Sequence, residues 1–337
     1  MSRVAVVGAG VMGAEIALVA ALAGHEVTLV DIDAAALERG LAHARAAGDR
    51  MVRRERLTQG DLDAAVARVG TATDVAAVAG CDPVIEAVPE RMELKRDVMA
   101  RIAAAVPEHT IVASNTSGLS ITELGAAAAP AGRVVGLHFF NPPSVMRLVE
   151  VIRGAETAHD VADRAAAFAA GLGKTPVAVR ECPGFVVNRV LLRAMVAGFV
   201  ATGAADPAEA DAAVVAAGPS PMGPHALADL VGLDTYEHIR GDLQRAYGDR
   251  FDDGGVGARM VAGRRLGRKN GGGFFDGPVP PVEAPRGLVR TVAGAYYDAA
   301  RDEAERLAAE GIASREDIDT AVRLGAGWTA GPLEAAG

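Results

Sequence analysis

A histidine and a glutamate twelve residues apart are the strongest candidates for acid–base chemistry in this sequence. His138 closes the apolar run Val134–Leu137 and precedes Phe139-Phe140-Asn141-Pro142-Pro143, which cannot continue as a central strand. Glu150 lies inside the apolar run 148–152, where a buried carboxylate needs a partner. A hairpin-like return of the chain would bring it beside His138. The pair predicts a base that works near neutral pH and is held by an acid; the alternative is a purely structural ion pair.

A second polar group, Ser114-Asn115-Thr116-Ser117-Gly118-Leu119-Ser120, follows the apolar run 110–113. Like His138, it stands at the carboxyl end of a predicted strand, which is the edge where doubly wound sheets bind ligands. The segment 120–123 reads Ser-Ile-Thr-Glu and is typical of a helix capping box. We therefore assign Ser120 to structure and Ser117 to the site.

These side chains need a sheet to position them, and the first residues predict one. The β-branched run 4–7 leads into Gly8-Ala9-Gly10-Val11-Met12-Gly13. A helical stretch 14–23 follows, and then a second strand 25–30 that ends at Asp31. This order of strand, glycine turn, helix, strand and acid predicts a dinucleotide-binding fold rather than a merely structural glycine turn.

Each residue of the turn has a physical role in that prediction. Gly8 permits the tight turn, Gly10 lets a pyrophosphate approach the backbone, and Gly13 lets the helix pack on the strand. The exposed amides at the start of the helix, around Val11 and Met12, would receive the phosphate charge.

Asp31 indicates which dinucleotide binds. A carboxylate at the end of the second strand accepts hydrogen bonds from a ribose diol and repels a 2′-phosphate, which favours NAD over NADP. The alternative role for Asp31 is a cap for the helix predicted over 34–45.

The remaining pattern predicts a Rossmann-type α/β domain, a doubly wound sheet, over residues 1–183. Residues 34–69 are expected to form a helical hairpin beside the sheet, and helical stretches separate most of the later strands. After Cys182-Pro183-Gly184 helical periodicity dominates. We expect an all-α C-terminal domain over 184–280, for substrate binding and dimerisation, and a partial second helical repeat over 285–337. Further strands are expected at 84–88, 110–113, 134–137, 148–151 and 177–179.

The evidence for the repeat is a constant offset in the second half of the chain. Ala208–Val214 resembles Glu316–Val322, and Gly223-Pro224 resembles Gly331-Pro332, both at an offset of 108 residues. The alternative is chance similarity between two Ala-rich helical stretches.

Composition narrows the function classes. The chain has 337 residues with 50% hydrophobic and 4% aromatic side chains, which favours closely packed helices and tight turns. A net charge of -9 argues against nucleic acid as a partner. Cys81 and Cys182 lack metal-ligand spacing, so neither a metal site nor a disulfide is expected. The most apolar stretch, 184–201, contains Arg189 and Arg193, so no membrane span is expected and a cytoplasmic protein is predicted.

The sequence resembles the L-3-hydroxyacyl-CoA dehydrogenase family, which includes 3-hydroxybutyryl-CoA dehydrogenases. The likeness covers residues 1–276 in order. The matching segments are 6–13, Ser114-Asn115-Thr116-Ser117, His138-Phe139-Phe140-Asn141-Pro142, 145–150, Gly173-Lys174-Thr175-Pro176, 183–189, Met222-Gly223-Pro224, 232–235 and 267–275.

The resemblance implies a role for each matching residue. His138 would be the general base and Glu150 its partner, with Ser117 and Asn188 contacting the substrate. Asp31, Glu90, Lys95 and Asn115 match cofactor-contacting positions. From the residues themselves, Asn188 has a helix cap or an interhelical hydrogen bond as its alternative, and Lys95 a solvated helix position.

The reaction implied is reversible, NAD-dependent oxidation of an L-3-hydroxyacyl-CoA to the 3-ketoacyl-CoA, by a homodimer. Two departures flank the substrate: Gly118 replaces a usual serine, and Pro143-Ser144 stands where Val-Pro is common. Asn141-Pro142-Pro143 and Val88-Pro89-Glu90 also resemble the L-gulonate 3-dehydrogenase and lambda-crystallin branch. The alternatives are therefore a dehydrogenase of a free hydroxy acid or of a carrier-protein-bound substrate, and a non-catalytic cofactor-binding protein.

Overall fold

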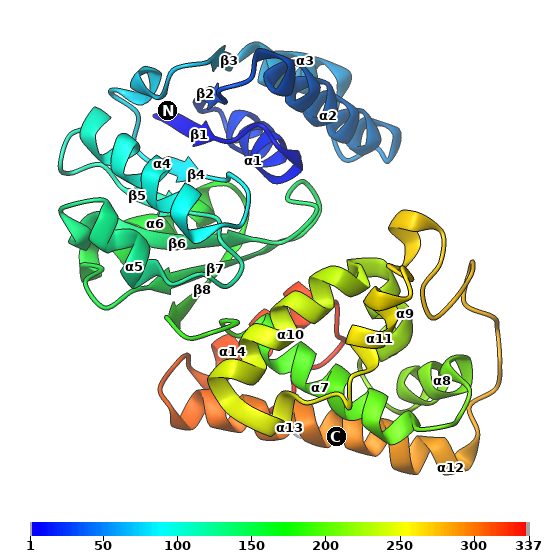
Figure 1. The fold of residues 1–337 in the computed structure, drawn as a ribbon. Coiled ribbons are helices and arrows are strands. Elements are labelled where there is room, and N and C mark those ends of the chain that lie inside the picture. Colours follow the sequence, from blue (N-terminus) through cyan, green and yellow to red (C-terminus); the bar gives the residue numbers. More distant parts are fainter. Residues whose placement is uncertain (1, 335–337) are drawn as a thin grey trace. The chain divides into compact units, whose positions relative to one another are not determined.

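The computed structural model describes residues 2–334, and the chain divides into two compact units. The first unit extends to Glu181 and the second begins at Cys182. Figure 1 shows the sheet in the first and a group of helices in the second. The helices predicted for 184–280 and for 285–337 share the second unit.

Eight strands form one sheet in the order β3-β2-β1-β4-β5-β6-β7-β8. The strands from β1 to β6 pair in parallel, whereas β7 pairs antiparallel with β6 and parallel with β8. The Rossmann-type prediction is thereby confirmed. The strands are β1 Arg3–Val7, β2 Glu26–Val30, β3 Val69–Ala72, β4 Val84–Glu86, β5 Val112–Ser114, β6 Val134–Phe139, β7 Leu148–Arg153 and β8 Thr175–Arg180.

Several helices of the first unit begin at a short polar side chain that caps them. Asp33, Thr58 and Ser120 accept hydrogen bonds from the first-turn amides of α2, α3 and α5, so the capping role predicted for Ser120 is confirmed. The helices are α1 Val11–Leu22, α2 Ala34–Arg53, α3 Gln59–Ala67, η1 Val75–Val78, α4 Met92–Ala105, α5 Ile121–Ala127, η2 Ala131–Arg133 and α6 His159–Gly171.

The expected hairpin over 34–69 is present as α2 and α3, but it ends at Ala67, and the strand β3 that follows was not predicted. Gly70 and Thr71, in the middle of β3, are exposed, because the strand lies at the edge of the sheet and pairs only with β2. An exposed edge strand lacks the apolar run by which buried strands are recognised.

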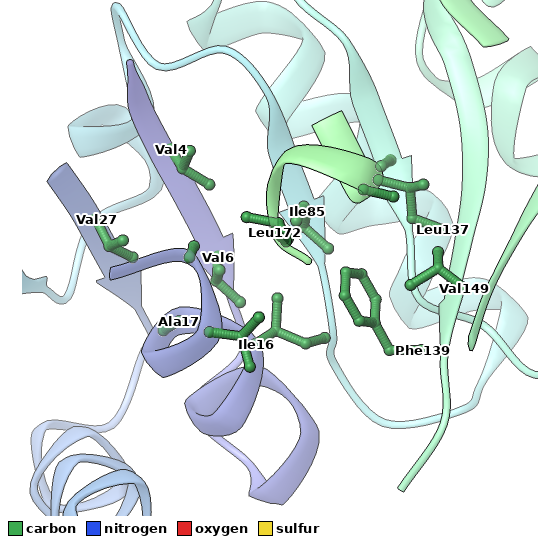
Figure 2. Packing of buried hydrophobic residues seen from close by; sticks show 14 of the residues in the cluster. Val4, Val6, Ile16, Ala17, Val27, Ile85, Leu137, Phe139, Val149 and Leu172 are labelled. Carbon is green, nitrogen blue, oxygen red and sulfur yellow. The ribbon is translucent and has the colours of Figure 1, made fainter. Parts of the chain in front are cut away.

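The core of the first unit lies between the sheet and two helices. Figure 2 shows Val4 and Val6 of β1 facing Ile16 of α1, with Phe139 of β6 beside them. The α6 helix adds Val161, Ala165 and Ala169 to the same cluster. Alternate strand residues, such as Ala5 and Val84, are buried as well, so the central strands are covered on both faces, as expected of parallel strands.

All the regular elements of the second unit, within residues 182–334, are helices, which confirms the all-α prediction; the β pairing there is an isolated bridge between Gly267 and Gly272. None of the helices within residues 2–334 combines the length and apolarity that crossing a membrane requires. The helices are α7 Val187–Thr202, α8 Pro207–Ala217, α9 Pro224–Val231, α10 Leu233–Tyr247, η3 Gly248–Phe251, α11 Val256–Ala262, η4 Arg268–Asn270, α12 Arg286–Leu288, the π-helical turn η5 Val289–Ala293, α13 Gly294–Ala309 and α14 Arg315–Ala326.

The structure confirms the predicted repeat. Asp211 of α8 accepts hydrogen bonds from the backbone amides of His225 and Ala226, and Asp319 of α14 accepts one from the amide of Leu333. Leu333 is His225 shifted by the same offset of 108 residues. A Cβ on Gly223 or on Gly331 would lie 2.3 Å from its aspartate, so both turns need glycine for the same reason.

The two copies are tied together by a buried ion pair. The α13 helix packs along α7 (Figure 1), and the Arg189 guanidinium lies 2.6 Å from Glu303, with both side chains fully buried. Glu310 accepts two further hydrogen bonds from Arg189. The repeat therefore forms one structural body rather than an appendage.

Candidate active site

The β6–β7 hairpin brings His138 and Glu150 together. The strand β6 extends to Phe139, so His138, which was predicted to close the strand, lies one residue before its end. In the antiparallel register His138 stands directly opposite Glu150, and its Nδ1 lies 2.7 Å from Glu150 Oε2. Both side chains are buried. The bond between Nδ1 and Glu150 fixes the orientation of the imidazole ring.

The glycine turn has the geometry that was expected of it. Gly8 has φ +111°, and a Cβ there would lie 2.6 Å from the Ala87 carbonyl oxygen. A Cβ on Gly13 would lie 1.9 Å from the Gly8 carbonyl oxygen. A Cβ on Gly10 would meet nothing within 4 Å, so it would occupy only the space in front of the turn. Gly8 and Gly13 are thus required by packing, whereas Gly10 keeps a surface open.

This open surface is the amino end of α1. Gly10 is the N-cap and no side chain within the described residues caps the helix, while Val11 is 52% exposed and Met12 is half-buried. Backbone amides at an uncapped helix start attract a phosphate. The turn therefore fits a dinucleotide pyrophosphate.

Asp31 follows the last residue of β2, and its side chain contacts the glycine turn. Its Oδ2 accepts a hydrogen bond of 2.8 Å from the Ala9 amide, and its Oδ1 accepts one from the Asp33 amide. The cap of α2 is Asp33, so the alternative of Asp31 as a helix cap is wrong. The position fits a carboxylate that binds the ribose of NAD.

Glu90 organises the polar segment after β5. It accepts hydrogen bonds from the hydroxyl of Thr116 and from both the amide and the hydroxyl of Ser117. Burial alone would raise the pKa of the Glu90 carboxyl, but the Lys95 ammonium and these hydrogen bonds hold it below its usual range. Glu90 is therefore an anion that fixes the backbone at Ser117.

Lys95 is buried, so its alternative role as a solvated helix residue is wrong. Its ammonium contacts three acceptors: Glu86 at 2.8 Å, the Val88 carbonyl at 3.0 Å and Glu90 at 3.3 Å. Burial raises the pKa of the Glu86 carboxyl, and Lys95 and Ser114 oppose this rise. Lys95 thus stabilises the carboxylates beside the predicted cofactor site.

The two asparagines lie in different units. Asn115 follows β5, and its side-chain oxygen accepts a hydrogen bond of 2.9 Å from the Phe139 amide, next to His138. Asn188 is the second residue of α7 in the second unit. The structure of the first unit thus gathers Ser117, Asn115 and the His138–Glu150 pair at the carboxyl ends of β5 and β6.

Sequence reasoning did not mention Glu15, and it gave no role to Ser144 or Lys174 although both lie in segments that it compared with the family. Glu15 is buried in the otherwise apolar helix α1, and it accepts hydrogen bonds from the amide and the hydroxyl of Ser144. Lys174 donates to two carbonyls in the same loop. A carboxylate inside an apolar run was the available signal for Glu15, the same signal that identified Glu150.

Comparison with known proteins gives the family. Residues 3–182 match the model of the NAD binding domain of 3-hydroxyacyl-CoA dehydrogenase. Residues 184–277 and 295–336 match the C-terminal domain of the same family. The chain belongs to the 3-hydroxyacyl-CoA dehydrogenase family. The resemblance drawn from the sequence, the fold that it implied and the NAD-binding character of the first unit are confirmed.

Individual relatives agree with this assignment. A 3-hydroxyadipyl-CoA dehydrogenase of Escherichia coli K12 is 40% identical over 280 residues, which are 82% of this chain and 59% of that protein. The chain thus spans about three fifths of the length of this curated relative. The structure of 3-hydroxybutyryl-CoA dehydrogenase from Escherichia coli K12 has a TM-score of 0.92 and 30% identity, over 98% of this chain and 90% of that one. The (S)-3-hydroxybutyryl-CoA dehydrogenase of Ralstonia eutropha has a TM-score of 0.79 and 40% identity, over 82% and 98%.

Proposed function

We propose that this protein is an NAD-dependent dehydrogenase that interconverts an L-3-hydroxyacyl-CoA and the 3-ketoacyl-CoA. The observation that carries the proposal is the buried His138–Glu150 pair, 2.7 Å apart, on a sheet whose first turn fits a dinucleotide. Removing a hydride from a secondary alcohol requires a base for the hydroxyl proton, and an imidazole held by a carboxylate is such a base.

In the proposed reaction His138 takes the hydroxyl proton of the substrate through Nε2. Glu150, bonded to Nδ1, stabilises the imidazolium that results. NAD, when bound, supplies the acceptor for the hydride that leaves C3. Ser117 and Asn188 would contact the substrate and orient it.

The same proposal assigns residues to NAD. Gly8, Gly10 and Gly13 shape the turn, and the amides near Val11 and Met12 would hold the pyrophosphate. Asp31 would accept hydrogen bonds from the ribose diol. Glu90, Lys95 and Asn115 would complete the binding site, with Lys95 acting through the two carboxylates that it contacts.

A substrate assay tests this function. Oxidation of NADH is followed with acetoacetyl-CoA, with a free 3-keto acid and with an acyl-carrier-protein thioester. The proposal expects turnover with acetoacetyl-CoA to exceed the others. Preference for the free acid would instead favour the L-gulonate-like alternative, and NADH binding without any turnover would favour the non-catalytic one.

The oligomeric state and the cellular location are further parts of the proposal. The family resemblance favours a homodimer and the composition a cytoplasmic protein. The second copy of the repeat already packs on α7, so a dimer would have to use a surface other than this face of α7. Multi-angle light scattering measures the mass in solution; the mass of one chain would overturn the homodimer.

A further inference from the structure

The loop 140–147, which joins β6 to β7 and begins two residues after His138, is held from two sides. From one side, Glu15 Oε2 accepts hydrogen bonds from the amide of Ser144 at 3.1 Å and from its hydroxyl at 2.6 Å. From the other, the Lys174 ammonium donates to the carbonyls of Pro143 and Met146, the latter at 2.8 Å. We call Glu15 and Lys174, with these hydrogen bonds, the clamp. The clamp joins the loop both to α1 and to the turn that precedes β8.

The clamp acts where the catalytic hairpin is weakest. The β6–β7 ladder ends at the pair Phe139–Val149, one position beyond His138–Glu150. Ends of strands open first because they have paired neighbours on one side only. Fixing the loop suppresses opening next to the imidazole.

The clamp is built from charged groups that the proposed reaction does not use. Glu15 is 1% exposed, and its Oε1 lies 3.0 Å from His43 Nε2 and 3.4 Å from Arg50, both on α2. Lys174 is partly buried, and the negative charge of Glu15 favours its protonated form. Arg147, whose carbonyl pairs with the Thr175 amide, is exposed at the end of the loop.

We propose that Lys174 and Glu15 are positioning residues that hold the loop 140–147, and with it His138, in the geometry for proton transfer. The inference rests on the proposed role of His138. It also assigns a function to Ser144, whose hydroxyl gives Glu15 a second hydrogen bond beside that of the backbone amide.

The protonation of Lys174 gives the clamp a signature. Burial lowers the pKa of the Lys174 ammonium to about 8, against the opposing effect of Glu15. Hydrogen bonds from an ammonium are stronger than those from a neutral amine, so the clamp weakens as the pH rises through about 8. The free energy of unfolding changes with pH in the opposite direction to the strength of the clamp. The folded state loses this proton at a lower pH than the unfolded chain, so the contribution of Lys174 to stability grows from about pH 8 to 10.5.

The test compares K174M and K174R in the full chain, in the oxidation direction with L-3-hydroxybutyryl-CoA and NAD, because His138 is then the proton acceptor. K174M is expected to lower kcat by about tenfold or more, because small displacements of a catalytic group are costly. The KM for NAD should stay the same. K174R should restore kcat at neutral pH and move the fall in kcat near pH 8 to higher pH, since a guanidinium stays protonated.

Two further variants complete the experiment. K269M removes an exposed lysine of the second unit and should leave kcat and its pH profile unchanged. S144A removes one of the two bonds to Glu15 and should lower kcat less than K174M does.

A wild-type kcat and pH profile in K174M would overturn the inference. So would a K174R variant whose kcat falls at the same alkaline pH as that of the wild type. If K174M does not fold, a wild-type kcat in S144A together with an unmoved alkaline fall of kcat in K174R overturns the inference. Failure of the proposed function is a separate result, because it is read from full activity in H138A.

Discussion

At the residue scale, the proposed chemistry depends on a pair of side chains that the register of two strands brings together. His138 and Glu150 are direct neighbours across an antiparallel ladder, and both are buried. A carboxylate in this position fixes one ring nitrogen and compensates the charge that the ring acquires. The orientation of the imidazole is therefore a property of the hairpin and not of the histidine alone.

Replacing His138 with alanine tests this directly. We expect kcat to fall by about 10²–10⁴-fold, the usual contribution of a general base. NADH binding, measured by fluorescence titration, should remain nearly unchanged, because the glycine turn is untouched. Loss of NADH binding together with activity would point to misfolding and weaken the assignment.

Lys95 sets a second expectation at this scale. K95M leaves the buried Glu86 without its cation, and breaking a buried ion pair typically destabilises a protein by about 3–5 kcal/mol. K269M, which breaks an exposed pair with Asp234, should change stability by about 1 kcal/mol or less. Urea unfolding followed by circular dichroism compares the two. Equal effects would contradict the structural role given to Lys95.

At the element scale, the glycine turn separates packing from binding. G13A places a Cβ 1.9 Å from a carbonyl oxygen, so it should destabilise the protein by about 1–3 kcal/mol. G10A meets no atom within 4 Å and should leave the free energy of unfolding within about 0.5 kcal/mol. G10A should nevertheless raise the Kd for NADH about tenfold or more, because its methyl group stands where the pyrophosphate approaches. Thermal unfolding with and without NADH measures both effects; a destabilised G10A would refute this division of roles.

Much of this fold can be predicted from patterns among residues that are close together in the sequence. The order of strand, glycine turn and helix over residues 4–23 is local, and the antiparallel return that pairs His138 with Glu150 needs only the two apolar runs and the prolines between them. The repeat was visible because Asp211 and Asp319 keep the same spacing to their glycines.

The remaining features depend on contacts between distant segments. Lys95 has the sequence surroundings of a solvated helix residue. It can be buried because it forms an ion pair with Glu86 of β4. Glu15 reaches Ser144 across 129 residues, a partnership that no local spacing encodes. The edge strand β3 has too few apolar residues to be recognised before β2 is in place beside it.

At the scale of the whole molecule, the second unit is held together by its own duplication. Arg189 of the first copy pairs with Glu303 of the second, both without exposure to solvent. R189M should destabilise the second unit by about 3–5 kcal/mol, since Glu303 loses a buried partner. R306M on the exposed side of α13 should have little effect. Trp328, the single tryptophan of the chain and a residue of this unit, reports the transition by its fluorescence. Coincident curves for R189M and the wild type would show that this pair does not join the copies.

The peptide link between α7 and α13 has a consequence for how the protein behaves on dilution. Two helices of one chain meet at an effective concentration set by the linker, and not by how much protein is in the tube. The packing that supports the amino end of α7, with Asn188, therefore persists at nanomolar protein, where an equivalent contact between separate chains would begin to dissociate.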